Sequence, residues 1–310
     1  MNIDFEKRHE LVKSSFYSEY ETLTMLTLQP GQKKQFVGDK DNRVCRYCGK
    51  RKGQVTFRKV AHAIPVLIGN KTLFDYSECD NCNGFFGQTI EDSFANYFHP
   101  HRTMNRIVGR KKPGYKTKEI MVEIDDNRNL NINIPYVEGG DPVYTKVASD
   151  LIRFNLSRRP YHPIAVYKMF VKIALALMPK EEDGLLKATK EWLVSPVQYA
   201  HMVDHKLIQF RIPGPSDPDI IRCALCKANE GLENKIVRFV LIFAFSNLQF
   251  QIPIPSAGNE SPRISMRLAP SLRPITEFME FGEPSVDVLD FTSNERVKGE
   301  KTEIYFRVEK

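Results

Sequence analysis

Two cysteine pairs constrain the fold of this chain more than any other feature. Cys45 and Cys48 form one Cys-x-x-Cys pair, and Cys79 and Cys82 form a second pair after thirty intervening residues. Two thiolates on one tight turn can face the same ion, and two such turns complete a tetrahedral zinc site. The alternatives are buried reduced thiols and disulfides. We predict that these four cysteines hold a structural zinc ion.

The N-terminus and the apolar runs argue against secretion and membrane insertion. The chain of 310 residues begins MNIDFEKRHE, which is too charged for a signal peptide. Its most apolar runs, 164–178 and 239–245, are short or interrupted by lysines. We therefore expect a cytoplasmic protein that does not associate with a membrane. Reducing conditions there would keep the thiols free for metal.

Basic residues are concentrated beside the cysteine pairs. Residues 31–60 contain ten Lys and Arg against two Asp, and residues 102–118 contain seven against no acid. The formal net charge of the whole chain is +7, so the remainder is net acidic. A single charged run is commonly a solvated surface. Two runs that flank a zinc segment favour a protein that binds the phosphate backbone of a nucleic acid.

The residues around the two cysteine pairs predict a strand, a loop and a helix. We expect a short strand over 55–60 that ends just before His62, because Pro65 stops regular pairing there. The composition of residues 68–71 predicts a turn that brings Asn70 close to His62. The run NGFFGQTIEDSFANYF predicts a helix that begins at Asn83.

These residues resemble the HNH endonuclease family in its zinc-containing ββα-metal form. The resemblance covers roughly positions 43 to 98. It depends on the histidine in AHAIP, the asparagine in IGN, the asparagine directly after the second cysteine pair, and the FFG and IE motifs that follow. The resemblance implies an enzyme that hydrolyses DNA phosphodiester bonds with a divalent metal ion.

The resemblance also implies a role for each motif residue. His62 would activate the attacking water, since an imidazole accepts a proton near neutral pH. Asn70 would hold the imidazole in orientation. Asn83 would be a ligand of the catalytic ion in place of the usual histidine. An amide oxygen suits Mg²⁺ or Mn²⁺ better than zinc.

Ala61 stands where family members often have an aspartate ligand before the histidine. One amide oxygen is a poor site for a divalent cation, so a carboxylate from elsewhere is required. The candidates are Glu78, Asp80 and Glu91. Glu91 occupies the family's IE position, eight residues after Asn83, and we predict it as the second ligand. The alternative is an ordinary charge on a helix surface.

The segment after the predicted helix has the composition of a phosphate-binding arm. It begins His99-Pro-His101, which we interpret as a turn with exposed histidines, and continues with seven basic residues. We predict that its basic side chains contact DNA phosphates. The predicted contacts are Arg102, Arg106, Arg110, Lys111, Lys112 and Lys116.

The flanking segments indicate an α+β fold class. Residues 4–28 place apolar side chains loosely at helical spacing, which predicts an N-terminal helical segment over 1–42. Residues 43–118 would be the HNH nuclease domain with its basic arm. Residues 119–310 predict a hairpin turning at 126–129, a helix from Pro163 and a strand-rich remainder. They would form an α+β domain of unknown role with a mainly antiparallel sheet.

A third Cys-x-x-Cys pair, Cys223 with Cys226, lies in an apolar strand. Positions three apart on a strand point to opposite faces of the sheet. We therefore expect buried free thiols there rather than a second zinc site with His201 and His205.

The predicted function is a metal-dependent HNH endonuclease that cleaves DNA, expected to be double-stranded, in bacterial anti-phage defence or restriction. Its expected cofactors are structural Zn²⁺ and catalytic Mg²⁺ or Mn²⁺. The C-terminal domain would provide a protein partner site or a homodimer contact. One alternative is a non-catalytic zinc-containing DNA-binding protein that recruits a partner. A weaker alternative has RNA as the substrate.

Overall fold

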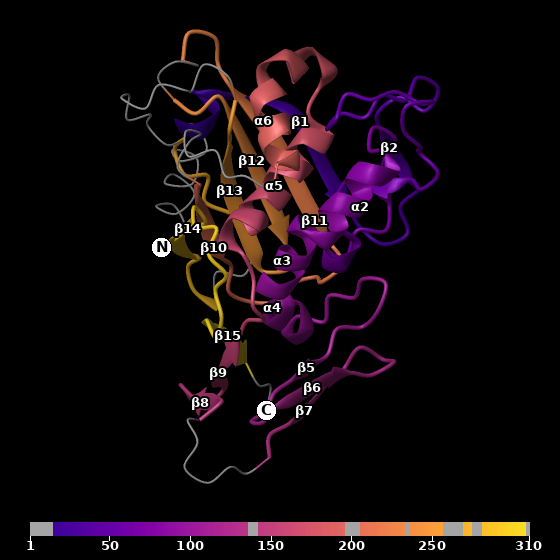
Figure 1. Cartoon of the computed structure of the whole chain (residues 1–310). Coiled ribbons are helices and arrows are strands. Elements are labelled where there is room, and N and C mark those ends of the chain that lie inside the picture. Colours follow the sequence, from indigo (N-terminus) through magenta and orange to yellow (C-terminus); the bar gives the residue numbers. More distant parts are fainter. Residues whose placement is uncertain are drawn as a thin grey trace.

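A six-stranded antiparallel sheet is the largest element of the computed structural model, which describes residues 15–135, 142–195, 205–232, 236–256, 269–274 and 281–307. Its strand order is β1 (Tyr20–Leu28), β11 (Ile221–Ala228), β12 (Phe239–Phe245), β13 (Leu248–Ile254), β10 (Lys206–Arg211) and β14 (Ser285–Asp290). Helices α5 (Pro163–Leu177) and α6 (Lys187–Val194) lie in front of the sheet (Figure 1). The predicted α+β class is confirmed.

The central strands bury both of their faces, as alternation along β11 illustrates. Cys223 and Leu225 belong to the larger apolar cluster, which also contains α5. Ala224 and Cys226 belong to a second cluster on the opposite face. Both cysteines are buried free thiols, so that prediction is confirmed, while His201 lies outside the described residues.

Helix α5 is apolar on nearly all sides, which is typical of a helix enclosed by other elements. Pro163 at its first turn lacks only an amide hydrogen that would have no partner within the helix. Pro179 follows soon after its last residue and prevents continuation. A 3₁₀ helix, η2 (Lys180–Leu186), then leads into α6, where the buried Trp192 is a core residue as expected.

The residues around the cysteine pairs form a small sheet and three helices beside α5 (Figure 1). The sheet order is β2 (Gln35–Val37), β4 (Leu73–Asp75) and β3 (Ala61–His62). A 3₁₀ helix, η1 (Val66–Ile68), lies between β3 and β4. Helices α2 (Asp80–Gln88), α3 (Ile90–Tyr97) and α4 (His99–Met104) follow, and α3 packs against α5.

Two further three-stranded sheets lie at the end of the molecule drawn lowest in Figure 1. One contains β5 (Tyr115–Lys116), β6 (Met121–Ile124) and β7 (Leu130–Asn133). The other contains β8 (Tyr144–Lys146), β9 (Leu151–Ser157) and β15 (Lys301–Arg307). The predicted hairpin is confirmed, because Ile124 pairs with Leu130 across the turn.

The prediction of a helical N-terminal segment is wrong for residues 20–28, which form strand β1 and pair with β11. The sequence YETLTMLTL alternates polar and apolar residues and contains three β-branched threonines, which suit a strand. Only residues 15–17 are helical among the described part of this segment. Residues 1–14 lie outside the described residues.

The strand predicted over 55–60 is also wrong, since the regular pairing begins at Ala61. The carboxylate of Asp80 accepts hydrogen bonds from the backbone N–H groups of Arg58 and Lys59, at 2.9 and 3.0 Å. The same carboxylate accepts one from the Thr56 hydroxyl at 2.6 Å. These donors are therefore not available to a neighbouring strand.

The single helix predicted from Asn83 is two helices, α2 and α3, that change direction at Thr89. The Thr89 hydroxyl donates to the Phe85 carbonyl at 2.7 Å and competes with the helical ladder. The predicted exposed turn at His99-Pro-His101 is wrong as well, because both histidines are buried in α4. Burial lowers the pKa of His101 to about 3, so its ring is neutral at pH 7.

One apolar cluster runs through the parts that sequence patterns separate. It contains Phe94 and Phe98 from the segment after the second cysteine pair, and Phe170, Phe245 and Phe250 from α5 and the large sheet. The division into 1–42, 43–118 and 119–310 stays a prediction. Within the described ranges, no helix combines the length and apolar content needed to cross a membrane.

Candidate functional site

The four cysteines of the two pairs come together as predicted. Their sulfur atoms lie within 4.8 Å of one another, with 3.7 Å between Cys45 and Cys82 and 3.8 Å between Cys48 and Cys79. A tetrahedron of Zn–S bonds of about 2.3 Å requires S···S distances of about 3.8 Å. The interaction with the Cys82 thiol lowers the pKa of Cys45, which favours a thiolate in the cluster. The cluster therefore fits a structural zinc ion.

His62 lies at the end of strand β3, directly opposite Phe74 of β4. The imidazole packs against the Phe74 ring, with 4.5 Å between ring centroids. Its Nδ1 atom is buried and has no hydrogen-bond partner among the described residues. The aromatic contact therefore restrains the ring.

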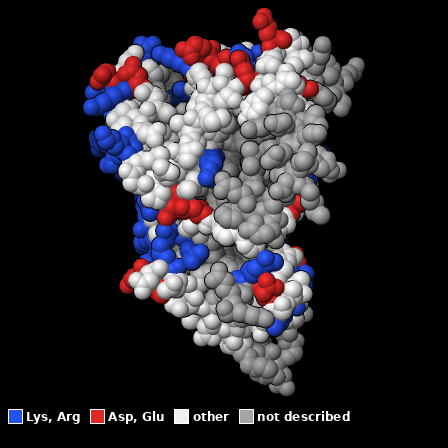
Figure 2. Space-filling model, turned by 180° about the vertical axis from the view of Figure 1, so that it is seen from behind, with Lys and Arg blue, Asp and Glu red and all other residues white. Residues whose placement is uncertain are grey.

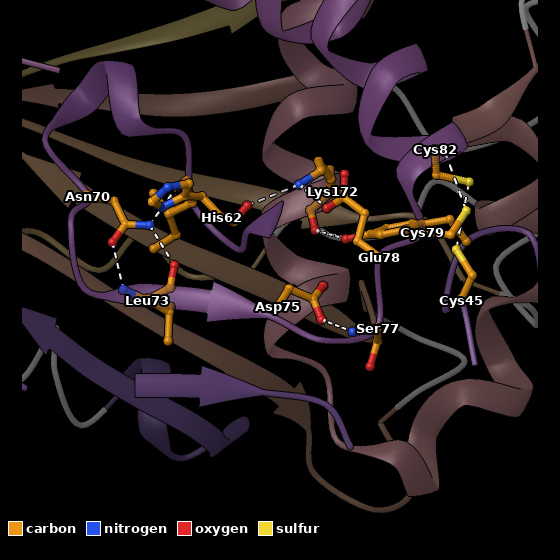
Figure 3. Close-up of polar contacts among 12 residues, drawn as sticks. Cys45, His62, Asn70, Leu73, Asp75, Ser77, Glu78, Cys79, Cys82 and Lys172 are labelled. Atoms are coloured by element: carbon orange, nitrogen blue, oxygen red, sulfur yellow. Dashed lines mark hydrogen bonds and ion pairs between the residues drawn. The ribbon is translucent and has the colours of Figure 1, made fainter. Parts of the chain in front are cut away.

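Asn70 holds the loop between β3 and β4 rather than the imidazole itself. Its side-chain amide donates to the carbonyls of Ile64 and Leu73, at 2.7 and 2.9 Å. Its carbonyl oxygen accepts from the backbone N–H groups of Thr72 and Leu73, at 3.1 and 2.9 Å. Figure 3 shows Asn70 on the loop beside His62. All the polar groups of the Asn70 side chain bind backbone atoms of the loop. Asn70 therefore acts on His62 through the backbone.

A cleft of about 650 Å³ opens beside His62 and is lined by six of the predicted site residues. Asn83 and Glu91 line it from α2 and α3, and His62 lines it from β3. Its lining also includes basic side chains from several segments. These are Lys59, Arg102, Arg110, Lys111 and Lys172.

The environment of the cleft lowers the pKa of His62 to about 4. Burial is the main cause, because it disfavours the charged ring. The positive charges of Arg110, Lys172 and Lys34 act in the same direction. His62 is therefore a neutral imidazole at pH 7, the form that can accept a proton.

The three candidate carboxylates have different surroundings. Asp80 is used by the backbone of the preceding loop and does not line the cleft. Glu78 lines the cleft but forms a 2.8 Å ion pair with Lys172, and both side chains are buried. Glu91 lines the cleft, and within the described chain its carboxylate forms no hydrogen bond or ion pair, although it interacts electrostatically with Arg102 and Lys172. It is the carboxylate that is free to bind a ligand.

The predicted basic arm divides between the cleft and other surfaces. Arg102 lines the cleft and donates to the Leu67 carbonyl at 2.5 Å, and burial lowers its pKa to about 10. Arg110 and Lys111 line the cleft as exposed side chains. The other three lie outside the cleft lining: Lys112 pairs with Asp126, and Arg106 and Lys116 are exposed. Figure 2 shows Lys and Arg gathered along the edge of the molecule that carries β2 and α2 in Figure 1.

Sequence patterns did not identify Lys172 or Phe74 as site residues. Lys172 lies 110 residues after His62 and occurs in an apolar helix, where the pattern indicates only packing. Phe74 has the alternation of a strand residue and no motif around it. The sequence signal that could identify Lys172 is a charged residue on a helix that is otherwise apolar, since a buried charge requires a partner.

We expect the protein to contain about one zinc ion per chain, held by the cysteine cluster. Cys82→Ser should remove the zinc and lower the melting temperature, because the turns at 45–48 and 79–82 lose their cross-link. Metal analysis and thermal unfolding measure these effects. Cys226→Ser is the matched control, since it also replaces a buried thiol but should keep the zinc. Equal zinc content in the two variants would contradict the assignment.

We expect His62 to protonate with a midpoint near pH 4, as its lowered pKa indicates. The unfolded chain has a value of about 6.5 and binds the proton more readily. Stability linked to His62 is therefore complete above about pH 6.5 and is lost as the pH falls toward 4. An NMR titration of the His62 ring, with His62→Ala to identify its signal, measures the midpoint. A midpoint near 6.5 would show that the ring is not shielded in the cleft.

Residues 45–99 match the family model described as HNH endonuclease. The matched range includes the four clustered cysteines as well as His62, Asn70, Asn83 and Glu91. The resemblance stated from the sequence is therefore confirmed for this part of the chain. Comparison with curated proteins and with solved structures finds no match.

Proposed function

We propose that this chain, whose residues 45–99 match the HNH endonuclease family, is a metal-dependent endonuclease that hydrolyses DNA phosphodiester bonds. The observation that carries the proposal is the cleft beside β3. It combines a neutral imidazole, an amide and an unpaired carboxylate with cationic side chains on its rim. That combination suits the cleavage of a polyanion by an activated water.

His62 acts as the general base. A neutral imidazole accepts a proton from water as the water attacks the phosphorus. A pKa near 4 makes His62 a weak base in the free protein. The negative charge of a bound phosphate raises that pKa, since it offsets the positive charges of Arg110 and Lys34. Substrate binding thereby makes the ring more basic when a base is needed.

Asn83 and Glu91 are the residues that would hold the divalent ion. Both side chains offer hard oxygen atoms in the same cleft, which Mg²⁺ and Mn²⁺ prefer. Glu91 replaces the carboxylate that Ala61 does not provide. When bound, the ion supplies charge stabilisation at the scissile phosphate and at the leaving 3′-oxygen.

The exposed cations position the substrate. Lys59, Arg110 and Lys111 line the cleft and are exposed, so they can contact phosphates on either side of the scissile bond. Arg102 is used partly by the Leu67 carbonyl and shapes the wall of the cleft. The zinc cluster has no chemical part in the reaction and maintains the fold of this segment.

The alternative, a zinc-containing DNA-binding protein without catalysis, is favoured by one observation. Ala61 is a buried residue at the position of the usual aspartate ligand, so the site has one carboxylate fewer than expected. The proposed role in anti-phage defence or restriction depends on the family resemblance alone. A protein partner or a homodimer contact of the C-terminal part is likewise a proposal.

We expect the wild-type protein to nick or cut plasmid DNA with Mg²⁺ or Mn²⁺, and His62→Ala to lose this activity by roughly 100-fold or more, as for the loss of a general base. Zinc content and salt-sensitive DNA binding should stay near wild type. Agarose electrophoresis, metal analysis and a filter-binding assay measure the three properties.

Cleavage that persists in His62→Ala would overturn the role of His62. Salt-sensitive DNA binding without cleavage by the wild type under any divalent ion would support the non-catalytic alternative. A parallel digestion of RNA decides whether DNA is the substrate.

We expect Glu91→Gln to raise the concentration of Mg²⁺ or Mn²⁺ needed for half-maximal cleavage by roughly 10-fold or more, because an amide binds a hard cation less tightly than a carboxylate. Asp92→Asn is the matched control, since Asp92 is the next residue of α3 and is exposed outside the cleft lining. Metal titrations of plasmid cleavage compare the two variants. An equal metal dependence in the two variants would show that Glu91 is not a ligand of the catalytic ion.

A further inference from the structure

Helix α5 places a lysine in the wall of the cleft, outside the matched range of residues 45–99. Lys172 is 4 % exposed, so nearly the whole side chain is removed from water. A buried ammonium group is stable only with close partners. The position of those partners indicates what the lysine does.

Lys172 contacts three separate parts of the HNH segment. Its Nζ atom forms the 2.8 Å ion pair with Glu78, the residue before Cys79. The same atom donates to the backbone carbonyl of His62 at 3.4 Å. It also lies 5.8 Å from the centre of the Tyr47 ring, between Cys45 and Cys48. Figure 3 shows Lys172 between His62 and Glu78, with the cysteines beyond Glu78.

A second contact joins α5 to the same segment, this time with the donor on the cysteine turn and the acceptors on the helix. Arg46 of the first cysteine turn donates to the carbonyls of Leu175 and Met178, both at 2.6 Å. These carbonyls lie at the C-terminal end of α5, where the Leu175 carbonyl also accepts from the Met178 backbone N–H at 3.2 Å. The last turn of α5 is therefore held at the cysteine cluster. This contact fixes the position of Lys172 along the axis of α5, beside His62.

We propose that Lys172 is a positioning residue for His62, so that α5 completes the active site of the HNH segment. The proposal depends on the proposed nuclease function for its consequence in catalysis. Strand β3 has only two residues, and the N–H of the His62–Ala63 peptide donates to the Leu73 carbonyl at 3.3 Å. The Lys172 hydrogen bond holds the carbonyl of that peptide, and the Phe74 ring holds the imidazole. A displacement of about 1 Å at a catalytic group can reduce a rate by about 100-fold.

A purely structural role would be the neutralisation of Glu78. Lys172→Met alone would leave a buried carboxylate without its partner, and that variant could fail to fold. The double variant Lys172→Met/Glu78→Gln removes both charges and avoids this problem. Glu78→Gln alone keeps the lysine, with the amide oxygen of Gln as its acceptor, together with its bond to the His62 carbonyl. The comparison of these two variants isolates the contact with His62.

Lys168 provides a matched control one turn earlier on α5. It is also buried, and its Nζ atom donates to backbone carbonyls of Trp192 and Ser195 at 2.9 and 2.8 Å. It does not line the cleft. Lys168→Met therefore removes a comparable buried ammonium group without touching His62.

The first readout does not require activity. Proteins labelled at histidine Cε1 are compared by NMR, with His62→Ala to identify the His62 signal among the seven histidines. We expect one sharp His62 signal at the same position in wild type, Lys168→Met and Glu78→Gln. In the double variant the His62 signal should shift and broaden. A double-variant signal that coincides with that of Glu78→Gln would overturn the proposal.

The second readout is the steady-state kinetics of DNA cleavage. We expect the double variant to lose roughly 10- to 100-fold in kcat, with KM within about twofold of Glu78→Gln, because the base is displaced while the exposed cations Lys59, Arg110 and Lys111 are unchanged. Equal kcat in the two variants would reduce Lys172 to a counter-ion for Glu78. If the wild type does not cleave DNA, the proposed function fails, while the NMR comparison still decides whether Lys172 positions His62.

Discussion

The contact between the two cysteine turns determines where the candidate site of this protein lies. Cys79 and Cys82 meet the first turn within 4.8 Å, so the residues beside them are held against the same cluster. Glu78 directly precedes this second pair and Asn83 directly follows it, and both line the cleft. The cluster therefore positions an ion-pair partner and a proposed metal ligand at once. A module with two short strands and a broken helix has little core of its own, so it needs such a cross-link.

Much of the candidate site could be predicted from the sequence because its residues belong to one local motif. His62, Asn83 and Glu91 have a spacing of the kind that a strand, a loop and a helix around one zinc site bring together, and all three line the cleft. The role of Asn70 was predicted less well. Its amide binds backbone atoms of its own loop, and no pattern of spacing distinguishes that from a bond to the imidazole. Lys172 could not be predicted, since it reaches His62 only through the packing of α5.

The errors in the predicted fold also arise from contacts between residues that are distant in the sequence. The pattern of apolar residues over 20–28 does not distinguish a helix from a strand. Pairing with strand β11, about two hundred residues later, makes this segment a strand. The strand predicted over 55–60 does not form because Asp80, more than twenty residues away, accepts its backbone donors. Helix α5 and the β6–β7 hairpin were predicted correctly, since Pro163 and the turn at 126–129 are local signals. Long-range partners therefore override local propensity where the local signal is weak.

The pairing of β1 with β11 has a consequence for the order in which the protein assembles during synthesis. Tyr20 faces Ala228 and Leu28 faces Ile221, so the first described strand has no partner until the ribosome has translated residues 221–228. The cysteine cluster can close long before that, because its last ligand is Cys82. Lys172 and the sheet that supports α5 are made later. The metal-binding part of a nascent chain would thus exist for some time without the helix that completes its cleft.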